Sequence, residues 1–339
     1  MRAEEIVETA RRLADEVLFP AAPSTDAAPI VPVENLDALA DAGLYGLSGP
    51  AAAGGLGADL DTACEVIELL AGGCLTTAFV WVQHLGAVLG VAFSKTPGLA
   101  DEWLAPMCRG ERRAGIALAG RLAGRPGLQA QAVEGGWLFS GAAPWVTGWN
   151  RIEVVHAAAR DSDGNAVFGL LDANTSATLE VSPPLDLVAV RASSTVRADL
   201  HGYFVPAGRV TAVAPPGDEG DVEVLRIHGA LVLGVASRCC RLLGGRPLDA
   251  ELVACRRGLA EATAETVHAA RAAASELALR AAAALVVSRG SRSLLAGEHA
   301  QRLAREALFL SVFGGRPPVR AALLELLGVR VPAQSGTDS

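Results

Sequence analysis

Few residues of this sequence have, by themselves, the type and spacing that chemistry requires. No histidine belongs to an HxxxH or HExxH pair, so no metal site is expected. There is no GxSxG run for a nucleophilic serine and no GxxxxGK(S/T) phosphate loop. The glycine-rich run at residues 54–57 (GGLG) does not follow a predicted strand, which argues against a Rossmann dinucleotide site. The histidines are His84, His156, His201, His228, His268 and His299.

Arginine carries nearly all the positive charge, because Lys95 is the only lysine. A phosphorylated ligand would therefore be held by guanidinium groups or by backbone N–H groups. The formal net charge is −8, and the basic residues are spread along the chain. This distribution argues against a nucleic acid or a membrane surface as the main partner.

The cysteines also indicate a compartment. All six lie outside CxxC pairs and mostly among apolar, helix-like residues, as expected of reduced thiols in a cytoplasmic protein. The N-terminus (MRAEEI) has no apolar signal core. No uninterrupted apolar run reaches the ~18 residues of a membrane-spanning helix. Hydrophobic residues make up 51% of the 339, enough for a large core.

Residues 1–113 are predicted to form an N-terminal α-helical domain. Apolar residues recur at helical spacing from Ile6 to Val17, and the prolines from Pro20 onward are expected to end this helix in a loop. Further helices are predicted over residues 34–42, from a cap at Asp59 or Asp61 through Leu69, over 75–93 and around 103–109.

The pattern then changes twice. Residues 114–212 are predicted to form a middle β-domain, because turn residues become frequent and apolar residues come in short bursts. Asp163-Gly164-Asn165 indicates a hairpin. Residues 213–331 are predicted to form a C-terminal helical bundle, in which the alanine-rich stretch 248–287 is two helices or one broken helix. Residues 332–339 are expected to be a flexible tail. The fold class is thus α+β and multidomain.

Several short runs follow one another along essentially the whole chain. They are residues 39–47 (LADAGLYGL), 50–57 (PAAAGGLG), 137–141 (WLFSG), 145–147 (WVT), 190–195 (VRASST) followed by Val205-Pro206, and 301–307 (QRLAREA). In this order they resemble the motifs of the acyl-CoA dehydrogenase family. One such run alone is a weak signal, whereas the ordered series is specific. The resemblance implies the family's helical, β and helical domains, with a C-terminal bundle shortened between Leu243 and Gly290.

The resemblance also implies a cofactor and a reaction. Family members bind FAD between the β-domain and the C-terminal helices and oxidise an acyl-CoA thioester. A carboxylate removes the α-proton while the flavin accepts hydride from the β-carbon. By match to the family's W-I-T/S motif, Trp145 would pack on the flavin and the Thr147 hydroxyl would bond near N5. Read without the other motifs, both also suit a core tryptophan and a strand threonine. Electrons would pass to an electron-transfer flavoprotein or another acceptor.

Two FAD-binding segments of the family are altered. The TEPxxGSD loop corresponds to residues 117–127 (ALAGRLAGRPG), which keep glycines but lack the Thr, Glu, Ser and Asp. Arg121 and Arg125 are new there and are expected to lie in solvent rather than on a phosphate. The RxQFG motif, which reaches the FAD of a neighbouring subunit, is absent, and residues 256–258 (RRG) are a poor substitute.

The family's catalytic base is also missing. It is usually the glutamate of IYEGT, at a fixed distance after ERLYRDA, and without a gap this position falls on Gly314, which cannot move a proton. Some relatives place the base on the first long helix of the C-terminal domain, where the register falls on Val224. The neighbouring Glu223 is a candidate only by a one-residue shift, which turns a helical side chain by about 100°. A solvated residue in the first turn is the simpler interpretation of Glu223.

Three functions remain open from the sequence. Because losing a general base costs ~10²–10⁴-fold in rate, the first is a subunit of an FAD-dependent acyl-CoA dehydrogenase without its own base. Such a chain resembles the non-catalytic subunit of heteromeric actinobacterial members, whose longer partner chain would supply the carboxylate. The second is a homo-oligomeric acyl-CoA dehydrogenase with a relocated base such as Glu223. The third is a flavin-free structural or binding protein with the same fold.

Overall fold

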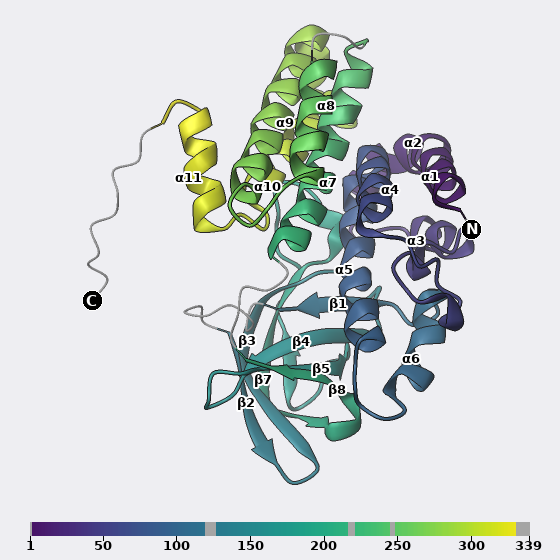
Figure 1. The fold of residues 1–339 in the computed structure, drawn as a ribbon. Coiled ribbons are helices and arrows are strands. Elements are labelled where there is room, and N and C mark those ends of the chain that lie inside the picture. The colour runs from purple at the N-terminus through teal and green to yellow at the C-terminus, as the bar shows by residue number, and fades with distance from the viewer. Residues whose placement is uncertain (1, 119–126, 216–220, 245–247, 330–339) are drawn as a thin grey trace. The chain divides into compact units, whose positions relative to one another are not determined.

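The computed structural model describes residues 2–118, 127–215, 221–244 and 248–329. The chain forms two compact units, residues 1–219 and 220–339. The first contains helices and a sheet, and the described part of the second contains helices (Figure 1). The domain boundaries expected at residues 113, 212 and 331 stay predictions, and the expected tail lies outside the described residues.

The first helix does not end at Pro20, contrary to the sequence prediction. Helix α1 (Ala3–Arg12) continues through a π-helical turn, Leu13–Leu18, into α2 (Phe19–Ala27), past Pro20 and Pro23. In the wider turn, the Phe19 N–H bonds to the Ala14 carbonyl. Pro20, which has no N–H, then lies in the first turn of α2, where prolines are tolerated. The π turn therefore lets the helix pass the first proline.

The remaining helices of the first unit are α3 (Val33–Asp41), α4 (Leu60–Gly73), α5 (Leu75–Ala92) and α6 (Leu99–Cys108). As predicted, Asp59 caps α4 by accepting the Thr62 N–H at 2.8 Å. Among the described residues, α5 alone is long and apolar enough to cross a membrane. However, 78% of it is buried inside the protein, as in the central core helix of a globular unit.

Eight strands of the first unit form one mixed sheet in the order β6–β7–β3–β2–β4–β5–β8, with β1 paired in parallel to β4. The predicted hairpin joins β4 and β5, and the Asp161 carboxylate holds its loop by accepting the Asn165 N–H at 2.8 Å. The strands are β1 (Ala114–Ala117), β2 (Leu128–Val133), β3 (Gly136–Val146), β4 (Val154–Arg160), β5 (Ala166–Asp172), β6 (Leu179–Val181), β7 (Val196–Pro206) and β8 (Val210–Ala214).

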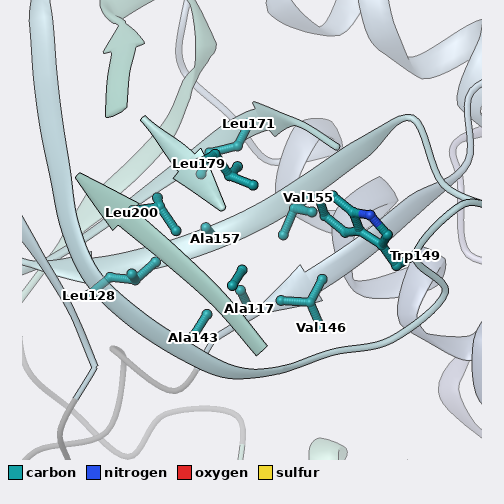
Figure 2. A pocket seen from close by; sticks show the side chains of 11 residues that line it. Ala117, Leu128, Ala143, Val146, Trp149, Val155, Ala157, Leu171, Leu179 and Leu200 are labelled. Atoms are coloured by element: carbon teal, nitrogen blue, oxygen red, sulfur yellow. The ribbon is translucent and has the colours of Figure 1, made fainter. Parts of the chain in front are cut away.

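The interior of this sheet is apolar and almost filled. Figure 2 shows side chains from several strands converging there, with Trp149 at one end. The cavity that remains is about 10 Å³, roughly the space of one water molecule. Because only apolar side chains line it, this interior is packing core and offers no polar group to a ligand.

The second unit is a helical bundle of α7 (Asp221–Leu242), α8 (Asp249–Ala260), α9 (Val267–Arg289), α10 (His299–Val312) and α11 (Pro317–Leu326). Helix α9 packs against each of the other four, and α7, α8 and α9 lie side by side in Figure 1. The alanine-rich stretch is therefore two helices. Within the QRLAREA run, Arg302 and Glu306 form a buried ion pair of 2.6 Å along α10.

His84 of α5 joins the helices of the first unit to its sheet. Its Nδ1 accepts the backbone N–H of Ala114, the first residue of β1, at 3.0 Å. Its Nε2 lies 3.1 Å from the Met107 carbonyl, so the proton is assigned to Nε2 and the ring is neutral. Burial lowers the pKa of His84 to about 3 and that of His156, a buried residue of β4, to about 4.

We expect the first unit to lose stability as the pH falls below about 6.5, the ordinary histidine pKa. Below this pH the unfolded chain protonates His84 and His156, whereas the folded protein keeps them neutral to about pH 4 or below. The unfolded state therefore binds more protons, and the free energy of unfolding should fall by about 1.4 kcal/mol per pH unit for each ring. Urea unfolding followed by circular dichroism at a series of pH values measures this slope.

Two variants isolate the contribution of His84. His84→Phe removes one titrating group. The free energy of unfolding should therefore change less steeply with pH, by about 1.4 kcal/mol per pH unit. Val88→Ala on the same helix removes buried volume but no titrating group, so it should lower stability equally at every pH. A His84→Phe variant with an unchanged slope would contradict the neutral, buried state of His84.

Candidate functional site

Trp145 projects from the sheet at an irregularity near the end of β3. The pairing of β3 with β7 shifts by one residue between Ala143 and Val146, so Pro144 and Trp145 fall in a bulge. Pro144 has no N–H to give to the ladder. Trp145 is 55% exposed, which excludes the alternative that it is a core tryptophan. Its indole is therefore available to a ligand.

Thr147, two residues further on, lies at the end of a buried chain of hydroxyl groups. Its Oγ1 is 3.1 Å from Oγ1 of Thr195, which is in turn 2.8 Å from Oγ of Ser193. All three residues are buried. Three hydroxyl protons serve these two bonds, and no further hydrogen bond from these hydroxyls is found within the described residues. One proton is therefore available to an acceptor outside the chain of hydroxyls.

The segment that carries Ser193 and Thr195 has a strained backbone. Val190 (φ 52°) and Ser194 (φ 48°) adopt the left-handed conformation, which is rare for side-chain-bearing residues and most unusual for a β-branched valine. Such residues cost about 1–3 kcal/mol each and cluster at functional sites. Hydrogen bonds hold the segment in place: its carbonyls accept the N–H groups of Gly148, Trp149 and Val31. The strain is thus imposed by the surrounding structure.

Two other segments that the family resemblance places at the cofactor contribute few described contacts to a flavin site. Arg121 and Arg125 lie outside the described residues. Residues 256–258 lie inside helix α8, and Arg256 donates to the Ser237 hydroxyl of α7 at 3.2 Å. The described features that could hold a flavin in the first unit are therefore Trp145 and the hydroxyl chain.

In the second unit, Gly314 lies just beyond the C-terminus of α10 in the left-handed conformation (φ 61°). The preceding carbonyls of Leu310 and Phe313 accept hydrogen bonds from the Arg271 guanidinium of α9, at 2.9 and 3.2 Å. Arg271 is 1% exposed and also donates to the Ser275 hydroxyl. Burial lowers its pKa to about 10, so the guanidinium stays charged at neutral pH and fixes this turn.

The imidazole of His228, from α7, packs directly against Gly314. A Cβ atom at Gly314 would overlap its Nδ1 and lie 2.5 Å from its Cε1. The ring also packs against Phe313, with centroids 4.8 Å apart. Nδ1 is buried without a hydrogen-bond partner. Burial, together with the positive charges of Arg271 and Arg316, lowers the pKa of His228 to about 3, so the ring is neutral at physiological pH.

Glu223 is exposed in the first turn of α7. It precedes His228 by five residues, which is about 140° around a helix, whereas Val224 precedes His228 by four and shares its face. The structure therefore does not bring Glu223 to the helix face that meets Gly314. Its role as a relocated base stays a prediction.

Comparisons with known proteins agree with this architecture. Residues 2–111 match the model of the acyl-CoA dehydrogenase N-terminal domain. The structure of a glutaryl-coenzyme A dehydrogenase in complex with glutaryl-CoA superimposes with a TM-score of 0.82 over 97% of this chain and 95% of that chain, at 19% identity. The chain therefore has the fold of acyl-CoA dehydrogenases, as predicted, with a helical N-terminal part, a mixed sheet and C-terminal helices.

Two relatives were identified by sequence. The mitochondrial short-chain specific acyl-CoA dehydrogenase of Bos taurus is 26% identical over 207 residues, 59% of this chain and 50% of the relative. An L-evernosamine nitrososynthase of a Micromonospora species is 30% identical over 207 residues, 56% of this chain and 47% of the relative. The chain thus spans about half the length of these relatives. The domain match covers residues 2–111, and the likeness to solved acyl-CoA dehydrogenase structures shows the fold.

The features of the first unit fit the flavin that this family implies. The exposed indole of Trp145 offers a flat apolar face, and the hydroxyl chain ending at Thr147 offers one donor. The motifs had indicated these residues. Sequence reasoning missed His228, because a lone histidine on an apolar helix gives no signal of the residue it faces.

The hydroxyl chain predicts unequal effects of removing its members. Thr195→Val removes the central hydroxyl and both hydrogen bonds, so it should lower the free energy of unfolding by about 2–3 kcal/mol. Thr147→Val removes one bond and should cost about 1 kcal/mol. In the double variant, Thr147→Val should add little, because its bond is already lost. Urea unfolding of the wild type, the two single variants and the double variant measures these differences. Additive losses would contradict the proposed chain of hydroxyl groups.

Proposed function

We propose that this protein is a subunit of an FAD-dependent acyl-CoA dehydrogenase, acting on an acyl-CoA thioester and lacking its own catalytic base. The observation that carries the second part is the packing at Gly314, where the ring of His228 occupies the place of a Cβ atom. The match of residues 2–111 to the acyl-CoA dehydrogenase N-terminal domain and the features of the first unit support the first part.

When bound, FAD would supply the acceptor for the hydride that leaves the β-carbon. Trp145 would orient the cofactor by stacking, since its side chain is already exposed at the bulge of β3. Thr147 would donate the spare hydroxyl proton of its chain to a flavin acceptor. Thr195 and Ser193 would fix the orientation of that hydroxyl. These residues bind and orient; none of them is a base for the α-proton.

The α-proton must then be taken by a group from elsewhere. We propose that a longer acyl-CoA dehydrogenase chain, assembled with this one in the cytoplasm, supplies the carboxylate and the missing FAD contacts. Electrons would leave through an electron-transfer flavoprotein or another acceptor. In the homo-oligomeric alternative Glu223 would be the base, but it is exposed and about 140° from the face that meets Gly314.

A second candidate is a flavin-dependent reaction that needs no α-proton abstraction. The missing carboxylate at Gly314 favours it, and the relative at 30% identity is named for nitroso-group synthesis, which oxidises nitrogen rather than carbon. The third possibility, a flavin-free protein, would leave the exposed Trp145 without a ligand.

Purification of the chain alone and with its longer partner separates these functions. Our proposal expects flavin absorbance and acyl-CoA oxidation only when both chains are expressed together. Turnover of acyl-CoA by this chain alone, abolished in Glu223→Gln, would support the relocated base. A colourless complex would favour the flavin-free protein. Flavin without acyl-CoA oxidation in the complex would favour the second candidate.

Trp145 provides a test of cofactor binding itself. Trp145→Ala should weaken FAD binding about tenfold or more, because stacking on an aromatic side chain contributes ~1–3 kcal/mol. Phe204→Ala is a matched control, since Phe204 is another exposed aromatic side chain of the same sheet. Titration of the apo-complex with FAD, followed by flavin fluorescence, measures both. Equal affinities of the two variants would refute the role of Trp145.

A further inference from the structure

At the end of α10, Gly314 packs against the half-buried ring of His228 from α7, although Gly314 itself is exposed. The residue is left-handed, so any side chain there is strained, and the position of its Cβ is taken by the ring of His228. The turn cannot easily move away, because Arg271 holds the carbonyls of Leu310 and Phe313 that precede it. The space normally filled by a side chain at this position is therefore filled from the opposite helix.

We propose that His228 closes the position of the family's carboxylate, so that this position cannot take a proton from a bound ligand and cannot be repaired by a glutamate alone. The inference depends on the proposed function in one respect only, because it takes Gly314 as the position of the family's catalytic base. The steric part depends only on the packing of His228 against Gly314 inside the second unit.

His228 is not itself arranged to replace the base. Its Nδ1 lies against the Gly314 backbone, buried and without a hydrogen-bond partner. The charged groups that act on the ring are Arg271 of α9 and Arg316, which follows α10, and both are positive. A proton added to the ring, which is half-buried, would lie beside two cations, so proton transfer to His228 is unfavourable. A carboxylate at the same place would become neutral on accepting the proton, so this repulsion would not arise.

A double-mutant cycle tests the steric part without flavin or substrate. Gly314→Glu should lower the midpoint of thermal unfolding of the full chain by roughly 5 °C or more beyond Gly328→Glu. Gly328 is the matched control, because it is also left-handed (φ 76°) and follows a helix, but a Cβ there meets no atom within 4 Å. Adding His228→Ala to Gly314→Glu should restore most of this extra loss in the midpoint. Adding His228→Ala to Gly328→Glu should restore none of the midpoint.

If Gly314→Glu is tolerated as well as Gly328→Glu, or if His228→Ala relieves neither, His228 does not close the position. Both outcomes are independent of whether the chain binds FAD or acyl-CoA, so failure here is distinct from failure of the proposed function.

The chemical part is tested by exchange of the α-protons of butyryl-CoA in D₂O, read by mass spectrometry. The assay contains FAD and the complex of this chain with its longer partner, in which the partner's catalytic carboxylate is replaced by the amide, and the variants of this chain are compared in that complex. This readout needs a base but no electron acceptor. The proposal expects no exchange above background with the wild type, and at least tenfold faster exchange with the Gly314→Glu, His228→Ala double variant. Exchange by the wild type that disappears in His228→Ala would overturn it, because His228 would then be the base.

Discussion

The turn that follows α10 in the C-terminal unit depends on the buried guanidinium of Arg271. Removing a charge from water costs several kcal/mol unless its hydrogen bonds are replaced. Here the replacement is the negative end of α10, where the carbonyls of Leu310 and Phe313 accept two of its protons. Because these carbonyls point at Arg271, the chain must leave α10 at Phe313 and turn at Gly314. The turn then meets the ring of His228. A side chain at position 314 would therefore have to displace the ring of His228.

The first unit, which contains the sheet, differs from this tightly held turn. Its backbone at Val190 and Ser194 is strained, and its hydroxyl groups are joined in a chain that leaves one donor unused. Both features are unfavourable for a purely structural protein, since strain and unused donors lower stability. Trp145 is similarly displayed to solvent by the bulge around Pro144. The two units thus differ: the first keeps features that favour a bound ligand, whereas in the second the ring of His228 occupies the place of a side chain at Gly314.

Much of the fold was predictable from the sequence, because helices and strands with one apolar face carry their period in the residue order. The hairpin around Asp163 is an example. The passage of the first helix beyond Pro20 was not, since the π turn that permits it has no composition signal. At the site, motifs located Trp145, Thr147 and Gly314, which are local in sequence. The packing of His228 on Gly314 joins residues 86 positions apart, and only tertiary structure reveals it.

The difference between the first unit and the surroundings of Gly314 in the second limits the possible functions. Without a base, an α,β-dehydrogenation is slowed by ~10²–10⁴-fold, equivalent to about 3–5 kcal/mol of barrier. Stacking on Trp145 and one donated proton cannot recover this, because they act equally on the ground state and leave the α-proton in place. If position 314 corresponds to the base position of the acyl-CoA dehydrogenases, as we propose, the chain would obtain its base from a partner or catalyse a reaction that has no α-proton to remove. In both cases position 314 would be free for packing against the ring of His228.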